Sequence, residues 1–203
     1  MANITTKPIK EALDEQHLEM LRGESNISED VIAARGYYTE HDPEGLAKLG
    51  FDDNQKTLVP ALVIPVRAVT GEVVLHRIRP DDPRPNPYKP GKVNKYEMPT
   101  GTQNVLDIPP FTLNYLQEVA YPLWFTEGER KVDALVSQGL AAIGVFGVWS
   151  WKRGGLPLPD FDRIPMIGRD INILFDSDTE ENTNIRQALT CLARYIKGRV
   201  GDA

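Results

Sequence analysis

Three acidic residues follow apolar stretches that are typical of buried strands. Glu127 comes directly after "LWFT", and Asp176 and Asp178 come after "INILF". In a parallel sheet the carboxyl ends of the strands share one edge, and neighbouring strands lie about 5 Å apart. Side chains two positions apart on extended backbone point the same way, so Asp176 and Asp178 can face one volume. The three carboxylates could therefore converge, and they would repel one another unless a cation neutralised them.

Carboxylate oxygens in this number suit Mg²⁺ or Mn²⁺, which keep several waters and bridge to phosphate groups. The chemistry indicated is metal-assisted phosphoryl or nucleotidyl transfer. Each motif also has an ordinary structural role, because an aspartate after a strand often caps the next helix and a Glu-Gly pair is common at a strand-to-helix turn. Either motif alone is a weak signal. Together, in this order and on neighbouring predicted strands, they favour the metal site.

Such a site needs a sheet with helices on both faces, and the sequence from about residue 121 predicts one. We expect strands in "PLWFTEG", "LAAIGVFGVWSW" and "INILFDSD", and helices in "ERKVDALVSQG" and "NTNIRQALTCLARYIKG". Apolar strands that alternate with helices predict a parallel sheet, hence an α/β fold over residues 121–203. Gly128 would let the backbone turn sharply from the first strand into its helix.

The sequence upstream divides into two parts. We expect residues 1–55 to form a helical region, with short helices over about 10–23, 28–36 and 43–50. Residues 56–120 begin with two β-rich runs joined at "AVTGE", which predicts a hairpin with Gly71 in its turn. A loop rich in proline, glycine and basic residues follows, and then a short helix in "PPFTLNYLQEVAYP".

Basic residues gather in this middle part of the sequence. The net charge of −6 and pI of about 5.2 argue against a protein that coats nucleic acid with its whole surface. A local basic segment is still present, and it comprises Arg67, Arg77, Arg79, Arg84, Lys89, Lys92 and Lys95. Tyr88 and Tyr96 are interleaved with it, so nucleic-acid contact and a solvated surface are about equally good interpretations. Trp149 and Trp151 are better explained by packing than by base stacking.

Composition excludes several classes of protein. No apolar run approaches the roughly 20 residues of a membrane span, and the polar N-terminus does not resemble a signal or transit peptide. Cys191 is the only cysteine, which excludes an internal disulfide and a cysteine-based zinc cluster. We therefore expect a cytoplasmic protein.

The segments "TEGE…DAL…GLAAIGVFGVWSW…INILFDSD" resemble the toprim domain of DnaG-type primases, primase-helicases, topoisomerases and some nucleases. In particular, these segments resemble a poorly characterised primase-related toprim family of phage and plasmid replication proteins. Upstream, "ALVIPVRAVTGEVVLHRIRPDDP" and "NKYEMPTG" resemble the primase core ahead of that domain. The sequence ends where the family normally continues into another strand and a further acidic segment, so we expect either a reduced toprim domain or a truncated sequence.

The resemblance implies roles for individual residues. Glu127 matches the family's general acid/base or metal contact, and Asp176 and Asp178 match its paired metal-binding aspartates. Gly147 matches the glycine of the loop after the second strand. Lys95 and Arg79 fall where the primase core has basic residues that face template or nucleotide. We count Tyr96 and Lys131 as further candidate contacts to nucleic acid or nucleotide. Lys131 stands where primases usually carry an acid, with Asp133 two residues further on.

The function implied is primase-like nucleotidyl transfer on a nucleic-acid template, dependent on Mg²⁺ or Mn²⁺, in the replication of a phage, plasmid or mobile element. The expected partners are single-stranded DNA, nucleotides and a replicative helicase. Two alternatives remain: a toprim endonuclease that uses the same metals to activate water, and a non-catalytic nucleic-acid-binding accessory module.

Overall fold

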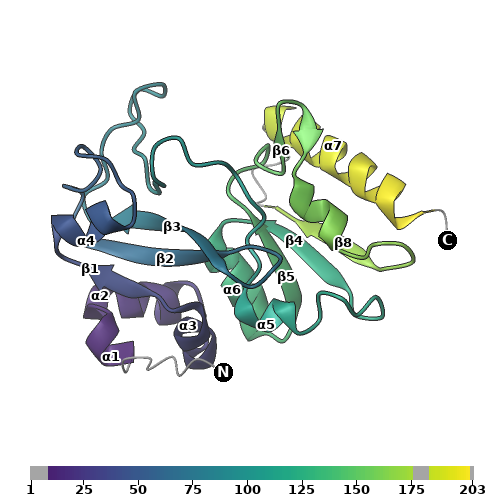
Figure 1. Cartoon of the computed structure of the whole chain (residues 1–203), viewed down its shortest axis with the longest axis horizontal. Helices are drawn as coiled ribbons and strands as arrows, with labels where there is room; N and C mark the ends of the chain where they lie inside the picture. Colours follow the sequence, from purple (N-terminus) through teal and green to yellow (C-terminus); the bar gives the residue numbers. More distant parts are fainter. Residues whose placement is uncertain (1–8, 176–182, 202–203) are drawn as a thin grey trace. The chain divides into compact units, whose positions relative to one another are not determined.

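The computed structural model describes residues 9–175 and 183–201. The chain forms two compact units (Figure 1). One comprises Met1–Val66 and Val73–Gln103, and we call it the N-unit; the other comprises Arg67–Glu72 and Asn104–Ala203, and we call it the C-unit. In the described part of the chain, no helix is long and apolar enough to cross a membrane.

The N-unit is built on a small sheet whose central strand is covered on both faces. Its strands are β1 (Tyr38–Glu40), β2 (Ala61–Arg67) and β3 (Val73–Pro80), in the order β1-β2-β3. β2 and β3 form the predicted hairpin, and Gly71 takes φ +86° in its turn. Leu46 of α4 (Pro43–Lys48) packs against Ala61 and Val63 on one side of β2. Arg35 of α3 (Glu29–Arg35) is fully buried and donates to the carbonyl of Pro65.

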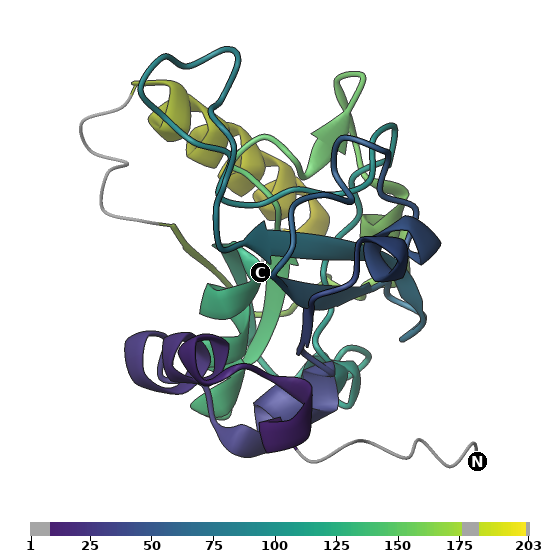
Figure 2. The same cartoon turned by 90° about the vertical axis from the view of Figure 1, so that its left-hand side faces the viewer.

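The first predicted helix, over residues 10–23, is wrong as a continuous element. The structure has α1 (Ile9–Ala12), α2 (Glu15–Glu19) and a π-helical turn (Met20–Glu24) instead. The break falls at Asp14, which is extended with ψ 151°. Its backbone N–H donates to Thr39 Oγ1 of β1 at 2.9 Å, so it is not available to a helical carbonyl. Figures 1 and 2 both show α1, α2 and α3 gathered on one side of the N-unit sheet.

The second predicted helix is confirmed by α3. It starts after Ser28 and ends at Gly36, which takes the left-handed conformation with φ 83° that a glycine C-cap favours. The third is confirmed by α4, where the side chain of Asp42 accepts from the N–H of Glu44.

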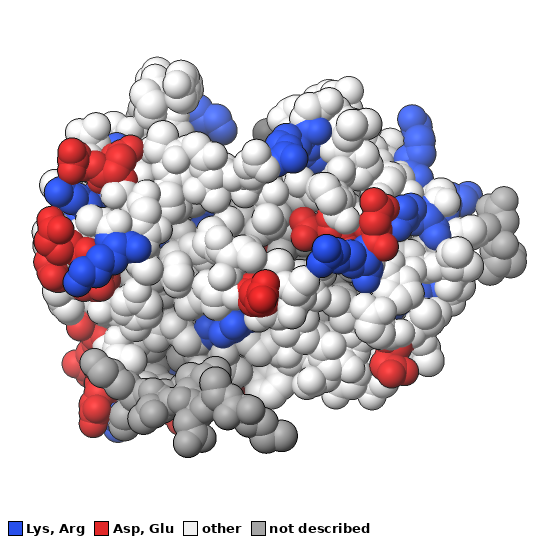
Figure 3. All heavy atoms as spheres, in the orientation of Figure 1, with Lys and Arg blue, Asp and Glu red and all other residues white. Residues whose placement is uncertain are grey.

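Acidic and basic side chains lie beside one another at the surface of the N-unit. Lys56 Nζ is 3.5 Å from Glu44 Oε1 and 3.0 Å from Asp53 Oδ1. Figure 3 shows both signs together at the left of the view, where Figure 1 places α4. The charge of Lys56 is therefore offset by neighbouring acids at this surface.

The C-unit contains the predicted parallel sheet. Its strands are β4 (Leu123–Glu127), β5 (Ala141–Val145) and β8 (Ile171–Leu174), in the order β5-β4-β8. Its helices are α5 (Pro110–Leu113), α6 (Glu129–Ser137) and α7 (Thr183–Val200). The sequence did not predict the hairpin of β6 (Lys152–Arg153) and β7 (Leu156–Pro157), nor the 3₁₀ helix Pro159–Arg163.

Both faces of this sheet are covered. On one face Phe125 and Ile143 are fully buried with Leu192 of α7, and Phe125 stacks on Phe161 with ring centroids 5.8 Å apart. On the other face α6 packs so closely that a Cβ at Gly144 would lie 2.8 Å from Val132 Cγ2. Figure 1 shows α6 and α7 on opposite sides of the three strands. The predicted fold class, an α/β sheet flanked by helices with a small α+β region before it, is confirmed.

Candidate active site at the carboxyl edge of the parallel sheet

Glu127 is the last residue of the middle strand and lies at the carboxyl edge of the sheet. Thr126, just before it, pairs with Gly144 of β5 on one side and with Leu174 of β8 on the other. Glu127 itself pairs with Val145, and the N–H of Gly128 donates to the Val145 carbonyl at 2.9 Å. The three strands therefore end within about one residue of one another, as the sequence predicts. The Glu127 side chain is half-buried at this edge.

Asp176 and Asp178 lie outside the described residues. β8 ends at Leu174, Phe175 is the last described residue after it, and the description resumes at Thr183, the first residue of α7. In the sequence the two aspartates fall between these points. The predicted convergence of three carboxylates therefore stays a prediction, while both flanks of the aspartate segment are part of the C-unit.

α7, the helix that follows the aspartate segment in the sequence, is bonded to the loop that follows β5. The indole Nε1 of Trp149 donates to Asn184 Oδ1 in the first turn of α7 at 3.0 Å. Lys152 Nζ lies 4.1 Å from the centroid of the Trp149 ring and 5.3 Å from that of Trp151. Trp151 is buried and stacks on Tyr195 of α7, with centroids 5.6 Å apart. Trp151 packing was predicted; neither Lys152 nor Asn184 was singled out, because contacts between individual side chains leave no periodic signal in the sequence.

Gly128 has the backbone role that the sequence suggests. It takes φ 86° and ψ 141°, a region that is essentially restricted to glycine. A Cβ there would have no atom within 4 Å, so the requirement comes from the backbone and not from crowding. Gly147 is different: its φ is not positive, and a Cβ would lie 3.3 Å from Ser150 Oγ within the turn closed by Ser150 N–H and the Gly147 carbonyl.

The acids of α6 are directed away from solvent. Glu129 is 1% exposed and Asp133 is fully buried, whereas Lys131 is exposed. The aspartate two residues after Lys131 is therefore part of the packed side of the helix. Within residues 9–175 and 183–201, no group of three or more histidine, cysteine, aspartate or glutamate side chains is arranged to hold a metal ion. The predicted carboxylate set also includes Asp176 and Asp178, and carboxylate oxygens are hard ligands that fit Mg²⁺ or Mn²⁺ in chemical type.

The basic segment separates into residues with different environments. Arg84 of the N-unit forms two 2.6 Å hydrogen bonds with the carboxylate of Glu97, which also accepts from Gln55 Nε2 at 3.1 Å. The Glu97 side chain is only 5% exposed and belongs to the N-unit interior, whereas the Arg84 side chain is 40% exposed. Arg67, the last residue of β2, donates from Nη1 to the carbonyl of Gly71 in the hairpin turn at 3.2 Å.

Two arginines of β3 lie over the ring of one tyrosine, Tyr96. The guanidinium carbons of Arg77 and Arg79 lie 5.1 and 5.4 Å from the centroid of Tyr96, and Arg79 Nη1 is 3.4 Å from the Tyr96 hydroxyl. Arg77 is buried and Arg79 is half-buried. The lysines of the following loop, by contrast, are exposed: Lys89, Lys92 and Lys95. Among the described residues these three form no ion pair, so their charge is available to a partner.

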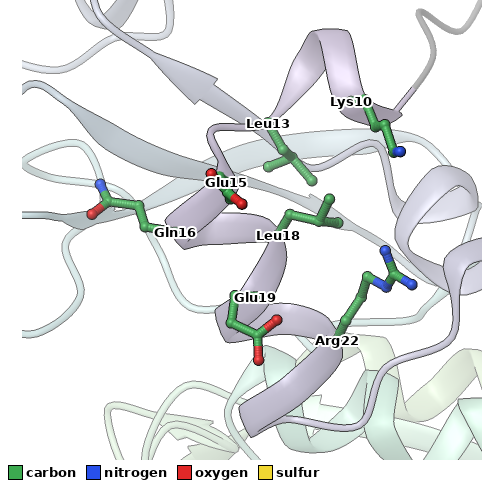
Figure 4. Close-up of a pocket in the computed structure, with 7 residues that line it drawn as sticks. All are labelled: Lys10, Leu13, Glu15, Gln16, Leu18, Glu19 and Arg22. Carbon is green, nitrogen blue, oxygen red and sulfur yellow. The ribbon is translucent and has the colours of Figure 1, made fainter.

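A hollow on the N-terminal helices offers a different set of groups. Figure 4 shows Leu13 and Leu18 side by side, with charged groups of both signs around them. The residues that line it are Lys10, Leu13, Glu15, Gln16, Leu18, Glu19 and Arg22. Because acids and bases are mixed and the floor is apolar, this hollow lacks the carboxylate set that a divalent-metal site needs.

His17 is a buried link within the N-unit. Its Nδ1 lies 2.8 Å from Thr39 Oγ1 and its Nε2 lies 2.9 Å from Asp81 Oδ1. The ring therefore connects α2 to β1 and to the residue that follows β3. Thr39 and Asp81 are far from His17 in the sequence, so their pairing could not be read from spacing.

Comparison with known proteins supports the sheet assignment. A family model described as a domain of unknown function (DUF3854) matches residues 111–202. A search of curated proteins finds no match. The zinc-binding and RNA polymerase domains of the Aquifex aeolicus primase align with TM-score 0.62 and 14% identity, over 92% of this chain and 48% of that one. The E. coli primase catalytic core aligns with TM-score 0.54 and 14% identity, over 87% and 59%.

A further solved structure, a DnaG primase catalytic domain bound to ssDNA, aligns with TM-score 0.54 and 15% identity, over 86% of this chain and 57% of that one. The chain thus spans 48 to 59% of these three solved chains. At such identities the likeness is one of fold. The predicted resemblance to DnaG-type primase cores, with their toprim fold, is confirmed at that level.

Proposed function

We propose that this protein is a primase-like nucleotidyltransferase that joins nucleotides on a single-stranded DNA template. One observation carries the proposal. Glu127 ends the middle strand of the parallel sheet at the same edge as β8, and the sequence continues from β8 through Phe175 into Asp176 and Asp178. This edge is where ligands bind in open parallel sheets. The toprim fold shared with primase catalytic cores supports the same reading.

In the proposed reaction, the 3′ oxygen of the growing strand attacks the α-phosphorus of a nucleoside triphosphate. A bond forms between that oxygen and the α-phosphorus, the bond from the α-phosphorus to the bridging oxygen breaks, and pyrophosphate leaves. Asp176 and Asp178 would hold Mg²⁺ or Mn²⁺, which when bound neutralises charge on the phosphates and the attacking oxygen. The Glu127 carboxylate accepts the proton of the 3′ hydroxyl or contributes a further ligand.

The remaining assignments belong to the same proposal. Residues 121–203 form the toprim-like catalytic part, residues 56–120 the primase-core-like hairpin and basic loop, and residues 1–55 a helical N-terminal part. Strand contacts come from the basic segment and Tyr96, and from Lys131 on α6, which is exposed. Gly147 shapes the loop that follows β5. The biological setting is replication of a phage, plasmid or mobile element, with a replicative helicase as a further partner.

The test is a gel assay of strand synthesis. Labelled single-stranded DNA is incubated with NTPs and dNTPs and with Mg²⁺ or Mn²⁺, using wild type, Glu127→Gln, Asp176→Asn and Asp178→Asn. The matched control is Asp170→Asn, because Asp170 is an exposed acid at the opposite, amino end of β8. We expect new or extended strands from wild type and the control. Each of the three site variants should lose roughly 10²-fold or more in rate, and EDTA should abolish the product.

Other results would replace the proposal. Shortened strands with the same dependence on Glu127 and metal would identify a toprim endonuclease. Binding of DNA that is equal in all variants, without any change in strand length, would identify an accessory binding module. Synthesis that survives in Glu127→Gln and Asp176→Asn would remove the sheet edge from the reaction altogether.

A further inference from the structure

Lys152 is held between two tryptophans and has no acidic partner in the described part of the chain. Its ammonium group lies 4.1 Å from the centroid of Trp149 and 5.3 Å from that of Trp151, and the side chain is half-buried. Across residues 9–175 and 183–201, the structure gives it no ion pair and no side-chain hydrogen bond. Among basic side chains of the described chain, this combination of partial burial, aromatic contact and absent acid contrasts with Arg84, which is bound to Glu97.

Among the described residues, none uses the hydrogen-bonding capacity of this ammonium group. A lysine has three N–H donors, and an aromatic face attracts the charge without accepting a full set of hydrogen bonds. The rings also fix the position of a side chain that otherwise has much conformational freedom, which lowers the entropy lost when an anion binds. A positioned ammonium group with free donors is a ready partner for an oxyanion.

The place of Lys152 in the fold points to a phosphate ligand. It follows the loop that leaves the carboxyl edge of β5, and Trp149 in that loop bonds to Asn184 at the start of α7. Trp151, on the other side, stacks on Tyr195 of the same helix. In the sequence, α7 begins five residues after Asp178. The two rings that hold the lysine therefore both contact α7, the helix that follows the aspartate segment.

We propose that Lys152 binds the polyphosphate of the incoming nucleoside triphosphate, and that Trp149 is a positioning residue that holds the ammonium group in place. This rests on the proposed function, since it assigns a ligand to the same sheet edge. The chemistry recognised is a phosphate oxyanion. Its source is the free nucleotide rather than a phosphodiester of the bound strand, because Lys152 follows the loop that leaves the carboxyl edge of β5, in the unit that contains the candidate site.

The experiment measures nucleotide and DNA affinity separately. Wild type, Lys152→Gln, Lys152→Arg and Trp149→Phe are titrated with ATP and with inorganic tripolyphosphate in Mg²⁺ by calorimetry, and with a labelled single-stranded oligonucleotide by anisotropy. Lys197→Gln is the matched control, because Lys197 is an exposed lysine in the last turn of α7. Circular dichroism checks that each variant is folded, and Lys152→Arg keeps the cation on the rings if Lys152→Gln is unstable.

We expect Lys152→Gln to raise the dissociation constants of ATP and tripolyphosphate by roughly 10-fold or more, the usual effect of losing a charged hydrogen bond. Lys152→Arg should lose less, Trp149→Phe should weaken both ligands, and oligonucleotide affinity should stay within about twofold. Unchanged ATP and tripolyphosphate affinity in folded Lys152→Gln would overturn the inference. Loss of oligonucleotide affinity alone would assign the phosphate to the strand and overturn it as well.

The two proposals fail in different ways. If wild type synthesises strands in a Glu127-dependent manner while Lys152→Gln binds ATP normally, only the lysine assignment falls. If wild type neither synthesises strands nor binds tripolyphosphate, both fall. If wild type binds tripolyphosphate through Lys152 but makes no product, the phosphate site stands and nucleotidyl transfer does not.

Discussion

Replacing Gly128 with alanine should damage the C-unit through the backbone alone. The residue has φ 86° and ψ 141°, and a Cβ would have no atom within 4 Å. Holding an L-residue in such a region costs about 1–3 kcal/mol. The loss of chain entropy in the unfolded state offsets about 0.4–1 kcal/mol of this. The net loss of stability is about 1–2 kcal/mol, which lowers the melting temperature by roughly 2–8 °C for a chain of this size.

The same substitution should also displace the candidate site, because Gly128 joins Glu127 to α6. Gly139→Ala is the control: Gly139 has φ 80° at the other end of α6, and a Cβ there is equally unobstructed. Trp124, Trp149 and Trp151 all lie in the C-unit, so a fluorescence melt reports on that unit. We expect both variants to melt earlier and only Gly128→Ala to lose strand synthesis. A Gly128→Ala protein with the melting temperature and activity of wild type would refute the argument that this turn needs glycine.

Three further perturbations test other parts of the molecule. Phe125→Ala should cost the C-unit about 3–5 kcal/mol in denaturant unfolding followed by tryptophan fluorescence, because the ring is fully buried; a loss below 1 kcal/mol would contradict the packing. Arg84→Met should destabilise the N-unit by about 1–3 kcal/mol by leaving Glu97 short of a partner. Lys95→Met should leave the melting temperature by circular dichroism unchanged but reduce the salt dependence of oligonucleotide binding by about one released ion. If Lys95→Met instead destabilised the N-unit and Arg84→Met only weakened DNA binding, Lys95 would be the structural residue and Arg84 the phosphate contact. Burial, and then the charge of Glu40, raise the pKa of Tyr38 to about 12. The contribution of Tyr38 to N-unit stability should therefore be complete below about pH 10 and be lost as the pH approaches 12. Tyr38→Phe should remove this dependence in alkaline melts, and an unchanged curve would exclude Tyr38 as its source.

The fold of the C-unit could be predicted because its signals are local. Alternating apolar runs and helical patterns give β4, α6, β5, β8 and α7, and Gly128 marks the turn beside Glu127. The N-terminal helices were harder, since the break at Asp14 depends on Thr39, 25 residues away in the sequence. A continuous helical pattern cannot reveal a competing acceptor that only tertiary structure supplies.

The candidate site also combines features that the local sequence predicts with features that depend on tertiary contacts. The position of Glu127 follows from strand order and register, both of which apolar patterning predicts. The state of the basic residues does not follow from the sequence, because a charge count cannot distinguish Arg84, paired with Glu97, from the exposed Lys95. Lys152 was missed for a related reason: its partners are aromatic faces, and aromatic residues in a loop are more often packing residues.

The partner of each cationic side chain determines whether that side chain could bind nucleic acid or nucleotides. Arg84 lies against a carboxylate, and Arg77 and Arg79 lie over one tyrosine ring, so removing any of them alters the N-unit itself. Phosphate contact made by such residues would change stability and affinity together. Lysines that are exposed, or that contact aromatic faces as Lys152 does, can be neutralised at a smaller structural cost. Lysine variants therefore report on phosphate affinity directly, whereas arginine variants report first on the stability of the N-unit.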